Sequence, residues 1–402
     1  MKKVWDKWTR IALVKRILVG LILGAILGIA VPQATGIAIL GDVFVSALKA
    51  IAPLLVFFLV ISSLCNAGKS HGGVIKTVII LYMFSTVLAA VIAVFASMAF
   101  PVKMTLANAA TDTSAPQGIV EVLNNLLLNV VANPVSSLVN ANYVGILMWA
   151  VLLGLAFRVA DKMTKKVLAD VADGISMVVT WIINLAPFGI FGLVFNTVST
   201  NGLDIFTTYG KLLILLVGCM LFIYFVTNPL LVYWCIRQNP YPLIFHCLKR
   251  SALTAFFTRS SAANIPVNMK VCEEMGLDRD TYSVTIPLGA TINMDGAAIT
   301  ITVMTMATAF TLGIHVDIPT AIILSLLAAL SACGASGVAG GSLLLIPMAC
   351  SLFGISDDIS MQVVAVGFII GVVQDSVETA LNSSSDLLLS ASAEFRQWRL
   401  EG

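Results

Sequence analysis

The chain has 402 residues, of which 59% are apolar and only 11% are charged, and its net charge is +2. Soluble domains carry about 25% charged residues, and a folded soluble protein of this size leaves roughly a quarter of its surface in water. The composition therefore excludes a soluble enzyme and a disordered chain, and the lack of a basic excess excludes a nucleic-acid-binding protein. A polytopic membrane protein remains.

Apolar segments long enough to span a bilayer, about 20 residues each, recur along the whole chain. The first segment follows Met-Lys-Lys, as a signal peptide would, but five further clear spans favour an uncleaved helix. Four later segments are interrupted near their middles by Ser, Gly, Asn, Pro or ionisable residues. The six clear segments cover 12–32, 43–65, 75–101, 124–157, 168–198 and 206–236, and the interrupted ones cover 241–269, 283–313, 317–354 and 360–392.

The positions of Lys and Arg predict the topology, because cytoplasmic loops are enriched in them. Basic clusters precede the first segment and follow the second, fourth and sixth, so the N-terminus is predicted to be cytoplasmic. Segment 241–269 has basic residues on both flanks and segment 317–354 has none on either flank. We expect each to enter and leave on one side, which gives eight transmembrane helices, two re-entrant hairpins of opposite orientation and a cytoplasmic C-terminus.

The two predicted hairpins resemble each other. Their polar tips are predicted at 260–266 and 334–342, and Ser261 precedes Asp295 by the same 34 residues as Gly341 precedes Asp375. Interrupted segments at matching places in two halves indicate inverted repeats and a transporter site. Glycine-packed spanning helices are the alternative, but they would leave Arg259 near the middle of the membrane without a purpose.

Ionisable residues deep inside these segments are few, and all follow residue 258. Each costs about 2.5–3.5 kcal/mol at a helix centre, so the cluster opposes insertion and a functional role is the default interpretation. A structural ion pair remains the alternative for any single member. The cluster comprises Arg259, Asp295, Asp375, Glu378 and Asp386.

Two polar patterns in this region differ in kind. Asp375, Thr379, Asn382 and Asp386 follow each other at i, i+4, i+7 and i+11, which predicts one polar stripe on one helix, bordered by Glu378. In contrast, Thr291, Asn293 and Asp295 are spaced by two residues and are flanked by Pro287, Gly289 and Gly296, which predicts an unwound helix. Exposed carbonyl, carboxamide and carboxylate oxygens suit a hard cation such as sodium.

These residues carry a resemblance to a known family. Arg259-Ser260-Ser261, the run 287–296 that ends in Asn-Met-Asp-Gly, and the stripe from Asp375 to Asp386 resemble the dicarboxylate/amino acid:cation symporter family, which includes the glutamate transporters. Segment order and hairpins match along nearly the whole chain. Within this family the sequence is most similar to the bacterial serine/threonine:sodium symporters.

The resemblance implies a role for each matching residue. One sodium ion would bind Asn293, Asn382, Asp386 and the carbonyl of Gly289. A second would bind carbonyls of Thr291, Ala332, Cys333 and Ala335, and a third would bind Tyr82, Ser85 and Thr86 with Asn293 and Asp295. Without the resemblance, Tyr82, Ser85 and Thr86 would equally fit an ordinary polar spot on a helix. The substrate carboxylate would meet the Ser261 region and Asn382, and its ammonium would meet Asp375 beside Thr379. The substrate-binding set is Ser260, Ser261, Val338, Gly340, Asp375, Glu378, Thr379 and Asn382.

The sequence also departs from the family. Glu378 stands where relatives that carry acidic substrates have Arg, and Ala297 stands where they have Thr. Asp375 and Glu378 would repel a second carboxylate, and no guanidinium anchors it there. This argues against glutamate, aspartate and C4-dicarboxylates and favours a small neutral amino acid. Ala262 and Ala339 also depart from common serine and proline positions at the hairpin tips.

The resemblance further implies a homotrimer, in the inner membrane of a bacterium, that moves its substrate by an elevator-type mechanism. Scaffold parts would cover 1–70 (helices 1–2) and 102–200 (helices 4–5). Transport parts would cover 71–101 (helix 3) and 201–402 (helices 6–8 and both hairpins). The prediction is sodium-coupled uptake of small neutral amino acids, best fitted by serine and threonine, with sodium co-transported and no enzymatic activity.

Three alternatives compete with this prediction. A proton-coupled symporter of another amino acid or small carboxylate fits the four buried carboxyl groups, but the carboxamides favour sodium. A channel fits less well, because the polar groups are concentrated in one half of the chain. An intramembrane serine protease would use Gly334-Ala335-Ser336-Gly337, but it needs a histidine base on a later helix, and no histidine follows His315.

The seven cysteines form no CxxC pair and are predicted to be apolar packing residues rather than disulfides or metal ligands.

Overall fold

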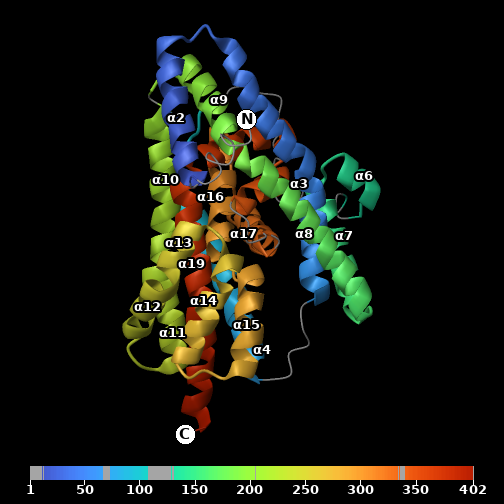
Figure 1. Ribbon diagram of the computed structural model, residues 1–402, viewed down its shortest axis with the longest axis vertical. Helices are drawn as coiled ribbons and strands as arrows, with labels where there is room; N and C mark the ends of the chain where they lie inside the picture. The colour runs from blue at the N-terminus through green and yellow to red at the C-terminus, as the bar shows by residue number, and fades with distance from the viewer. Residues whose placement is uncertain are drawn as a thin grey trace.

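The computed structural model describes residues 11, 13–66, 73–106, 128, 131–203, 205–333, 335 and 340–401. Within these ranges the chain is helical and contains no strand (Figure 1). Six helical segments in these ranges are long and apolar enough to cross a membrane: Thr35–Asn66, Gly73–Ala99, Lys162–Asn184, Phe206–Ile236, Arg279–Thr311 and Asp357–Glu401. The prediction of an all-α polytopic membrane protein is confirmed at this level.

The helices within 13–66 and 134–201 pack mainly against one another. Gly20, Gly24 and Gly28 repeat every fourth residue on one face of the first helix, and a Cβ atom on any of them would lie within 3.0 Å of an atom of α9. Small residues let helix backbones approach closely where lipid offers no hydrophobic drive for association. The group comprises α2 (Leu13–Ala30), η1 (Thr35–Ala38), α3 (Ile39–Asn66), α6 (Pro134–Val139), α7 (Tyr143–Ala156), η2 (Phe157–Val159), α8 (Lys162–Asn184) and α9 (Ala186–Asn201).

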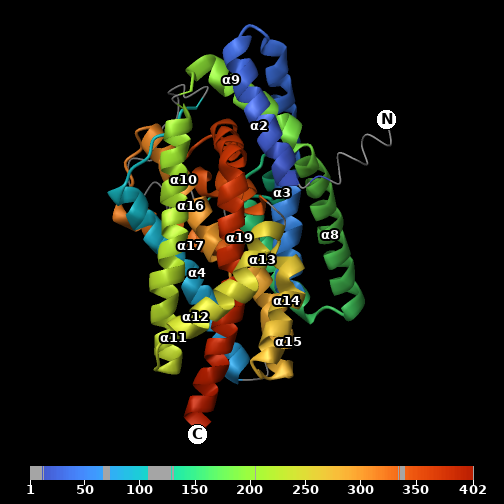
Figure 2. The same cartoon turned by 60° about the vertical axis from the view of Figure 1, so that its left-hand side comes forward.

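A second group surrounds the last helix. α19 (Asp357–Glu401) has 45 residues and runs along the long axis of the molecule, with α13 (Leu253–Thr258) and α14 (Ser261–Glu274) beside it in both views (Figures 1 and 2). At 1.5 Å per residue it is about 68 Å long. Its neighbours include α4 (Gly73–Ala99), α10 (Ile205–Phe222) and α11 (Asn228–Ile236), and the π-helical turn η3 (Ile223–Thr227) joins α10 to α11.

Three interrupted elements complete this group. The first contains α12 (Tyr241–Cys247), the π-helical turn η4 (Leu248–Ala252), α13 (Leu253–Thr258) and, after a break, α14 (Ser261–Glu274). The second contains α15 (Arg279–Ile292) and α16 (Asp295–Thr311). The third contains α17 (Ile318–Ala332), η5 (Gly341–Leu345) and α18 (Ile346–Ser351). The arms of the first element fold back on each other, since Arg250 forms an ion pair with Glu274.

The structure corrects three sequence-based boundaries. The segment 124–157 is not one helix in its described part, because α6 and α7 are separated at residues 140–142. The segment 168–198 is divided between α8 and α9 at Leu185, two residues before Pro187, whose ring cannot continue a helix without losing a backbone hydrogen bond. The first hairpin turns at Arg259 and Ser260, and 261–266 belong to α14 rather than to a long polar tip.

Candidate functional site

The break between α15 and α16 positions one set of polar groups. Asn293 and Met294 leave the helical conformation, although the Asn293 N–H still donates to the Gly289 carbonyl at 2.9 Å. Pro287, six residues before Asn293, lacks an N–H and already weakens this end of α15. The unwinding predicted from the spacing of Thr291, Asn293 and Asp295 is confirmed. At this break, Asn293 Nδ2 donates to Asp386 and the Gly296 N–H donates to Asn382, both on α19.

Asp386 of α19 lies opposite this break. Its Oδ1 accepts a hydrogen bond from Asn293 Nδ2 at 2.9 Å, and its backbone carbonyl accepts one from the Tyr82 hydroxyl at 2.8 Å. Asn293 Oδ1 is buried and has no hydrogen-bond partner. Gly289 leaves room beside these groups, because a Cβ there would lie 2.8 Å from Asp386 Oδ1 and 2.9 Å from the Tyr82 hydroxyl. A buried carboxylate beside an unpartnered carbonyl oxygen fits the oxygen ligands of a hard cation.

Asn382 lies one turn before Asp386 but is engaged elsewhere. Its Oδ1 accepts the N–H of Gly296, in the first turn of α16, at 2.7 Å, and its Nδ2 lies 3.4 Å from Met294 Sδ. Asn293 Nδ2 is 3.5 Å from the backbone carbonyl of Asn382. The backbone of Asn382, and not its side chain, therefore faces Asn293 and Asp386. Asn382 therefore fastens α19 to the start of α16.

Asp295 forms a second carboxylate group with α4. Its Oδ2 accepts a hydrogen bond from Ser85 at 2.8 Å and its Oδ1 accepts one from Thr86 at 3.3 Å. Thr86 Oγ1 also accepts the N–H of Met294 at 3.2 Å. Tyr82, Ser85 and Thr86 occupy i, i+3 and i+4 of α4, so they share one face, and the structure brings all three to the α15–α16 break.

The ends of α15 and α17 meet on the other side of the break. Cys333, which follows α17, directs its Sγ to the Ile292 carbonyl at 3.6 Å. The Ala332 carbonyl accepts the N–H of Ala335 at 2.9 Å, and the Thr291 hydroxyl donates to the Leu288 carbonyl at 2.7 Å. Two helix C-termini, each carrying partial negative charge, thus face the same region, and this arrangement favours a cation.

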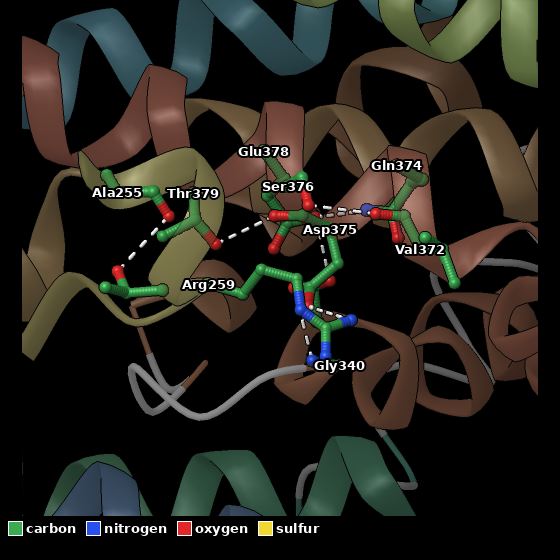
Figure 3. Close-up of polar contacts among 11 residues, drawn as sticks. Ala255, Arg259, Gly340, Val372, Gln374, Asp375, Ser376, Glu378 and Thr379 are labelled. Carbon is green, nitrogen blue, oxygen red and sulfur yellow. Dashed lines mark hydrogen bonds and ion pairs between the residues drawn. The ribbon is translucent and has the colours of Figure 1, made fainter. Parts of the chain in front are cut away.

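Arg259 and Asp375 form a buried ion pair. Arg259 ends α13 with a left-handed backbone (φ 51°), and its Nη1 lies 3.6 Å from Asp375 Oδ2 (Figure 3). The other oxygen of Asp375 accepts the Gly340 N–H at 3.2 Å. These three residues line a small cavity of about 20 Å³, whose remaining walls include Ile17 of α2 and Ala186 of α9. The pair therefore lies where the two groups of helices meet.

Glu378 points to a different set of partners. Its Oε2 accepts hydrogen bonds from Thr300 at 2.7 Å, Ser342 at 2.9 Å and Gln374 at 2.5 Å. Gly296 packs against it, since a Cβ there would lie 2.9 Å from the Glu378 Cα. Glu378 thus joins α16, α19 and η5. The ion-pair partner of Arg259 is Asp375 and not Glu378. Sequence reasoning missed Thr300, Ser342 and Gln374, although the i, i+4 spacing of Gln374 and Glu378 was a usable signal.

The remaining substrate candidates have local partners. Ser260 caps α14 by accepting the Ala263 N–H at 3.2 Å, and Ser261 is buried at the start of that helix. The Thr379 hydroxyl donates to the Asp375 carbonyl at 2.8 Å (Figure 3). Val338 lies outside the described residues.

A further polar network was also missed from the sequence. Ser251, Asn264 and Asn268 of the first interrupted element meet Ser383 of α19 in the protein interior. Asn264 Nδ2 donates to Ser383 Oγ at 2.8 Å and Asn268 Nδ2 donates to the Ser383 carbonyl at 2.8 Å. The Ser251 hydroxyl of the other arm donates to the Ser383 carbonyl at 3.4 Å, so both arms of the element are bonded to α19 three residues before Asp386.

Buried carboxylates at the break of a long apolar helix, beside interrupted elements, define a class of protein: the multi-pass membrane transporters, whose ion and substrate sites are built from discontinuous helices. Comparison with known proteins agrees. The sodium:dicarboxylate symporter family matches residues 13–394, so this chain belongs to that family and is a transporter rather than an enzyme.

Several relatives are similar over their whole length. The serine/threonine transporter SstT of Bifidobacterium adolescentis is 57% identical over 100% of this chain and 94% of its own length. The serine/threonine transporter SstT of Streptococcus thermophilus is 55% identical over 99% of this chain and 100% of its own. The family resemblance drawn from the sequence is confirmed.

Proposed function

We propose that this protein couples the inward movement of sodium to the uptake of small neutral amino acids, with serine and threonine as its substrates. The names of the relatives support this substrate class, and the family supports sodium as the coupling ion. The observation that carries the proposal is that one helix, α19, holds both Asp375 of the buried ion pair and Asp386 of the oxygen-rich group.

Three sodium sites are proposed, with sodium as transported cargo. The first uses Asp386, Asn293, Asn382 and the Gly289 carbonyl, and the unpartnered Asn293 Oδ1 supports it. The second uses the carbonyls of Thr291, Ala332, Cys333 and Ala335, supported by the meeting of two helix C-termini. The third uses Tyr82, Ser85, Thr86, Asn293 and Asp295, supported by the hydroxyl groups that surround the Asp295 carboxylate.

The substrate is proposed to bind around Asp375. An α-amino acid carries one positive and one negative charge, and Arg259 and Asp375 offer the opposite pair 3.6 Å apart. The ammonium would bind Asp375 beside Thr379, and the carboxylate would bind the Ser261 region and Asn382. Ser260, Val338 and Gly340 are proposed to complete the pocket, with Glu378 at its rim. The pocket has no second cation for a dicarboxylate, because Glu378 stands where acidic-substrate members have Arg. Dicarboxylates are therefore expected to be excluded.

The architecture proposed for this activity has eight transmembrane helices, two re-entrant hairpins at 241–269 and 317–354, and both termini in the cytoplasm of a bacterium. A scaffold (1–70 and 102–200) would form a homotrimer in the inner membrane, and a transport part (71–101 and 201–402) would move past it as an elevator. The packing of α2, α3, α7, α8 and α9 mainly on one another, and of α4 on α15, α16, α17 and α19, supports this division.

Uptake of labelled serine into proteoliposomes tests the proposal. With the pH equal on both sides, an inward sodium gradient is expected to drive the accumulation of serine. An equal potassium gradient is not expected to drive it. Proton coupling, the alternative that the buried carboxyl groups leave open, predicts accumulation driven by a pH gradient without sodium. That result would overturn the coupling proposed here.

A further inference from the structure

A large apolar groove lies away from the site, between α4 and α10. It encloses about 870 Å³, which is within the range of ligand pockets. Its walls include Phe95, Phe100 and Phe222, and the groove is open, since Phe100 is 68% exposed and Ile214 is 74% exposed. Both helices belong to segments long and apolar enough to cross a membrane, and exposed apolar side chains on such segments are expected to face lipid.

The length of the groove matches one leaflet of a bilayer. Along α10 the lining extends from Lys211 to Phe222, which is about 17 Å at a rise of 1.5 Å per residue. The hydrocarbon core is about 30 Å thick, so one leaflet is about 15 Å deep. The groove therefore runs from the level of Lys211 to about the middle of the membrane.

Charge is confined to one end of the groove. Lys211 is its only charged lining residue, and no ion pair among the described residues involves it. A lysine at this depth extends its ammonium towards the headgroup layer, where it meets phosphate. A second copy of this chain packed into the groove would bury that charge without a partner, which is unfavourable. We propose that the groove between α4 and α10 binds one acyl chain of an anionic phospholipid, whose phosphate is held by Lys211.

Two glycines of α10 provide a matched pair of variants. A Cβ at Gly218 would meet no atom within 4 Å, and Gly218 lines the groove, so a larger side chain there would fill it. A Cβ at Gly210 also meets no atom within 4 Å, but Gly210 is not in the lining. Leucine is a better helix former than glycine, so neither Gly218→Leu nor Gly210→Leu is expected to destabilise α10.

Native mass spectrometry of the full chain tests the proposal. Protein taken from nanodiscs with equal amounts of dioleoyl-phosphatidylglycerol and dioleoyl-phosphatidylethanolamine is expected to retain one phosphatidylglycerol per chain. Gly210→Leu is expected to match it, and Gly218→Leu is expected to lose the retained lipid. Lys211→Gln is expected to keep a lipid but to lower the preference for phosphatidylglycerol about fivefold, the factor that one lysine contributes at an anionic surface.

Three results would overturn the proposal. Wild-type protein that retains no lipid would mean that another occupant, such as residues 107–127 or a second copy, fills the groove. Equal retention by Gly218→Leu and Gly210→Leu, both with unfolding temperatures like that of the wild type, would place the lipid elsewhere. If the wild type shows no preference for phosphatidylglycerol, or if Lys211→Gln keeps the same preference, the Lys211 ammonium does not hold the lipid phosphate.

Discussion

The Arg259 guanidinium lies 3.6 Å from the Asp375 carboxylate, and both side chains are buried where the two groups of helices meet. Arg259 reaches this position through a left-handed backbone at the end of α13. In the proposed function the ammonium of a bound amino acid binds Asp375, and the substrate carboxylate binds the Ser261 region and Asn382. The substrate ammonium then replaces part of the contact between Arg259 and Asp375.

Asp375→Asn is expected to abolish serine binding, because the ammonium loses its charged partner and the Arg259 charge remains buried without compensation. Sodium binding is expected to survive, since Asp386 lies eleven residues further along α19 and its partner Asn293 lies at the α15–α16 break. Isothermal calorimetry with serine and a separate sodium titration measure the two affinities. Ser376→Ala is the control, because the Ser376 hydroxyl bonds only to the Val372 carbonyl of its own helix (Figure 3). Retained serine binding with lost sodium binding would reverse the assignment.

Asp386→Asn is expected to weaken the first sodium site, because one negative charge leaves the oxygen-rich group. A tenfold increase in the sodium concentration for half-maximal uptake corresponds to about 1.4 kcal/mol, and we expect at least that. Asp358→Asn removes a carboxylate from an exposed position of the same helix and leaves Asp357 to pair with Lys49, so it is the matched control. Unchanged sodium dependence in Asp386→Asn would contradict the site.

Gly289→Ala is expected to raise the sodium requirement several-fold without unfolding the protein. The added methyl group would lie 2.8 Å from Asp386 Oδ1 and 2.9 Å from the Tyr82 hydroxyl, so it would intrude on the proposed cation position. Gly174→Ala in α8 adds the same group where no atom lies within 4 Å. Sodium-dependent uptake and unfolding temperature are measured for both. If the two variants behave alike, Gly289 does not border a cation site.

Glu378→Ala is expected to lower the free energy of unfolding by about 2–4 kcal/mol, because the donors on Thr300, Ser342 and Gln374 lose a shared buried acceptor. Glu378→Gln keeps the shape and is expected to lose less. Denaturant unfolding in mixed micelles measures this difference. Ser392→Ala is the control, since its hydroxyl bonds only within α19. A Glu378→Ala protein of wild-type stability would show that these bonds contribute little.

The positions of most helices could be predicted from the sequence, because a bilayer demands long apolar segments whatever the tertiary structure. The break at Asn293 could also be predicted, since Pro and Gly flank a polar spacing that no single helical face accommodates. The divisions of 124–157 and 168–198 were missed because hydropathy averages over breaks, and the local signals, Pro187 and the residues around Ala141, are single positions in apolar surroundings.

The candidate site could be predicted only in part, because its contacts join elements that are far apart in the sequence. Tyr82, Ser85 and Thr86 precede their partners by 203 to 304 residues, and the spacing of three or four between polar residues is common on any helix. The pairing of Arg259 with Asp375 rather than Glu378 depends on the left-handed conformation at residue 259, which no periodicity indicates. Such partners are decided by how helices pack, not by the pattern along one of them.

The unbroken course of α19 has an electrical consequence. Asp375 and Asp386 are eleven residues apart on this helix, or about 17 Å along its axis, and no break separates them. Any displacement of α19 across the bilayer therefore moves both carboxylates together through the membrane potential, which contributes about 2.3 kcal/mol per unit charge per 100 mV. Cations bound beside these carboxylates cancel part of that charge, so the membrane voltage acts on the loaded and the empty helix with different force.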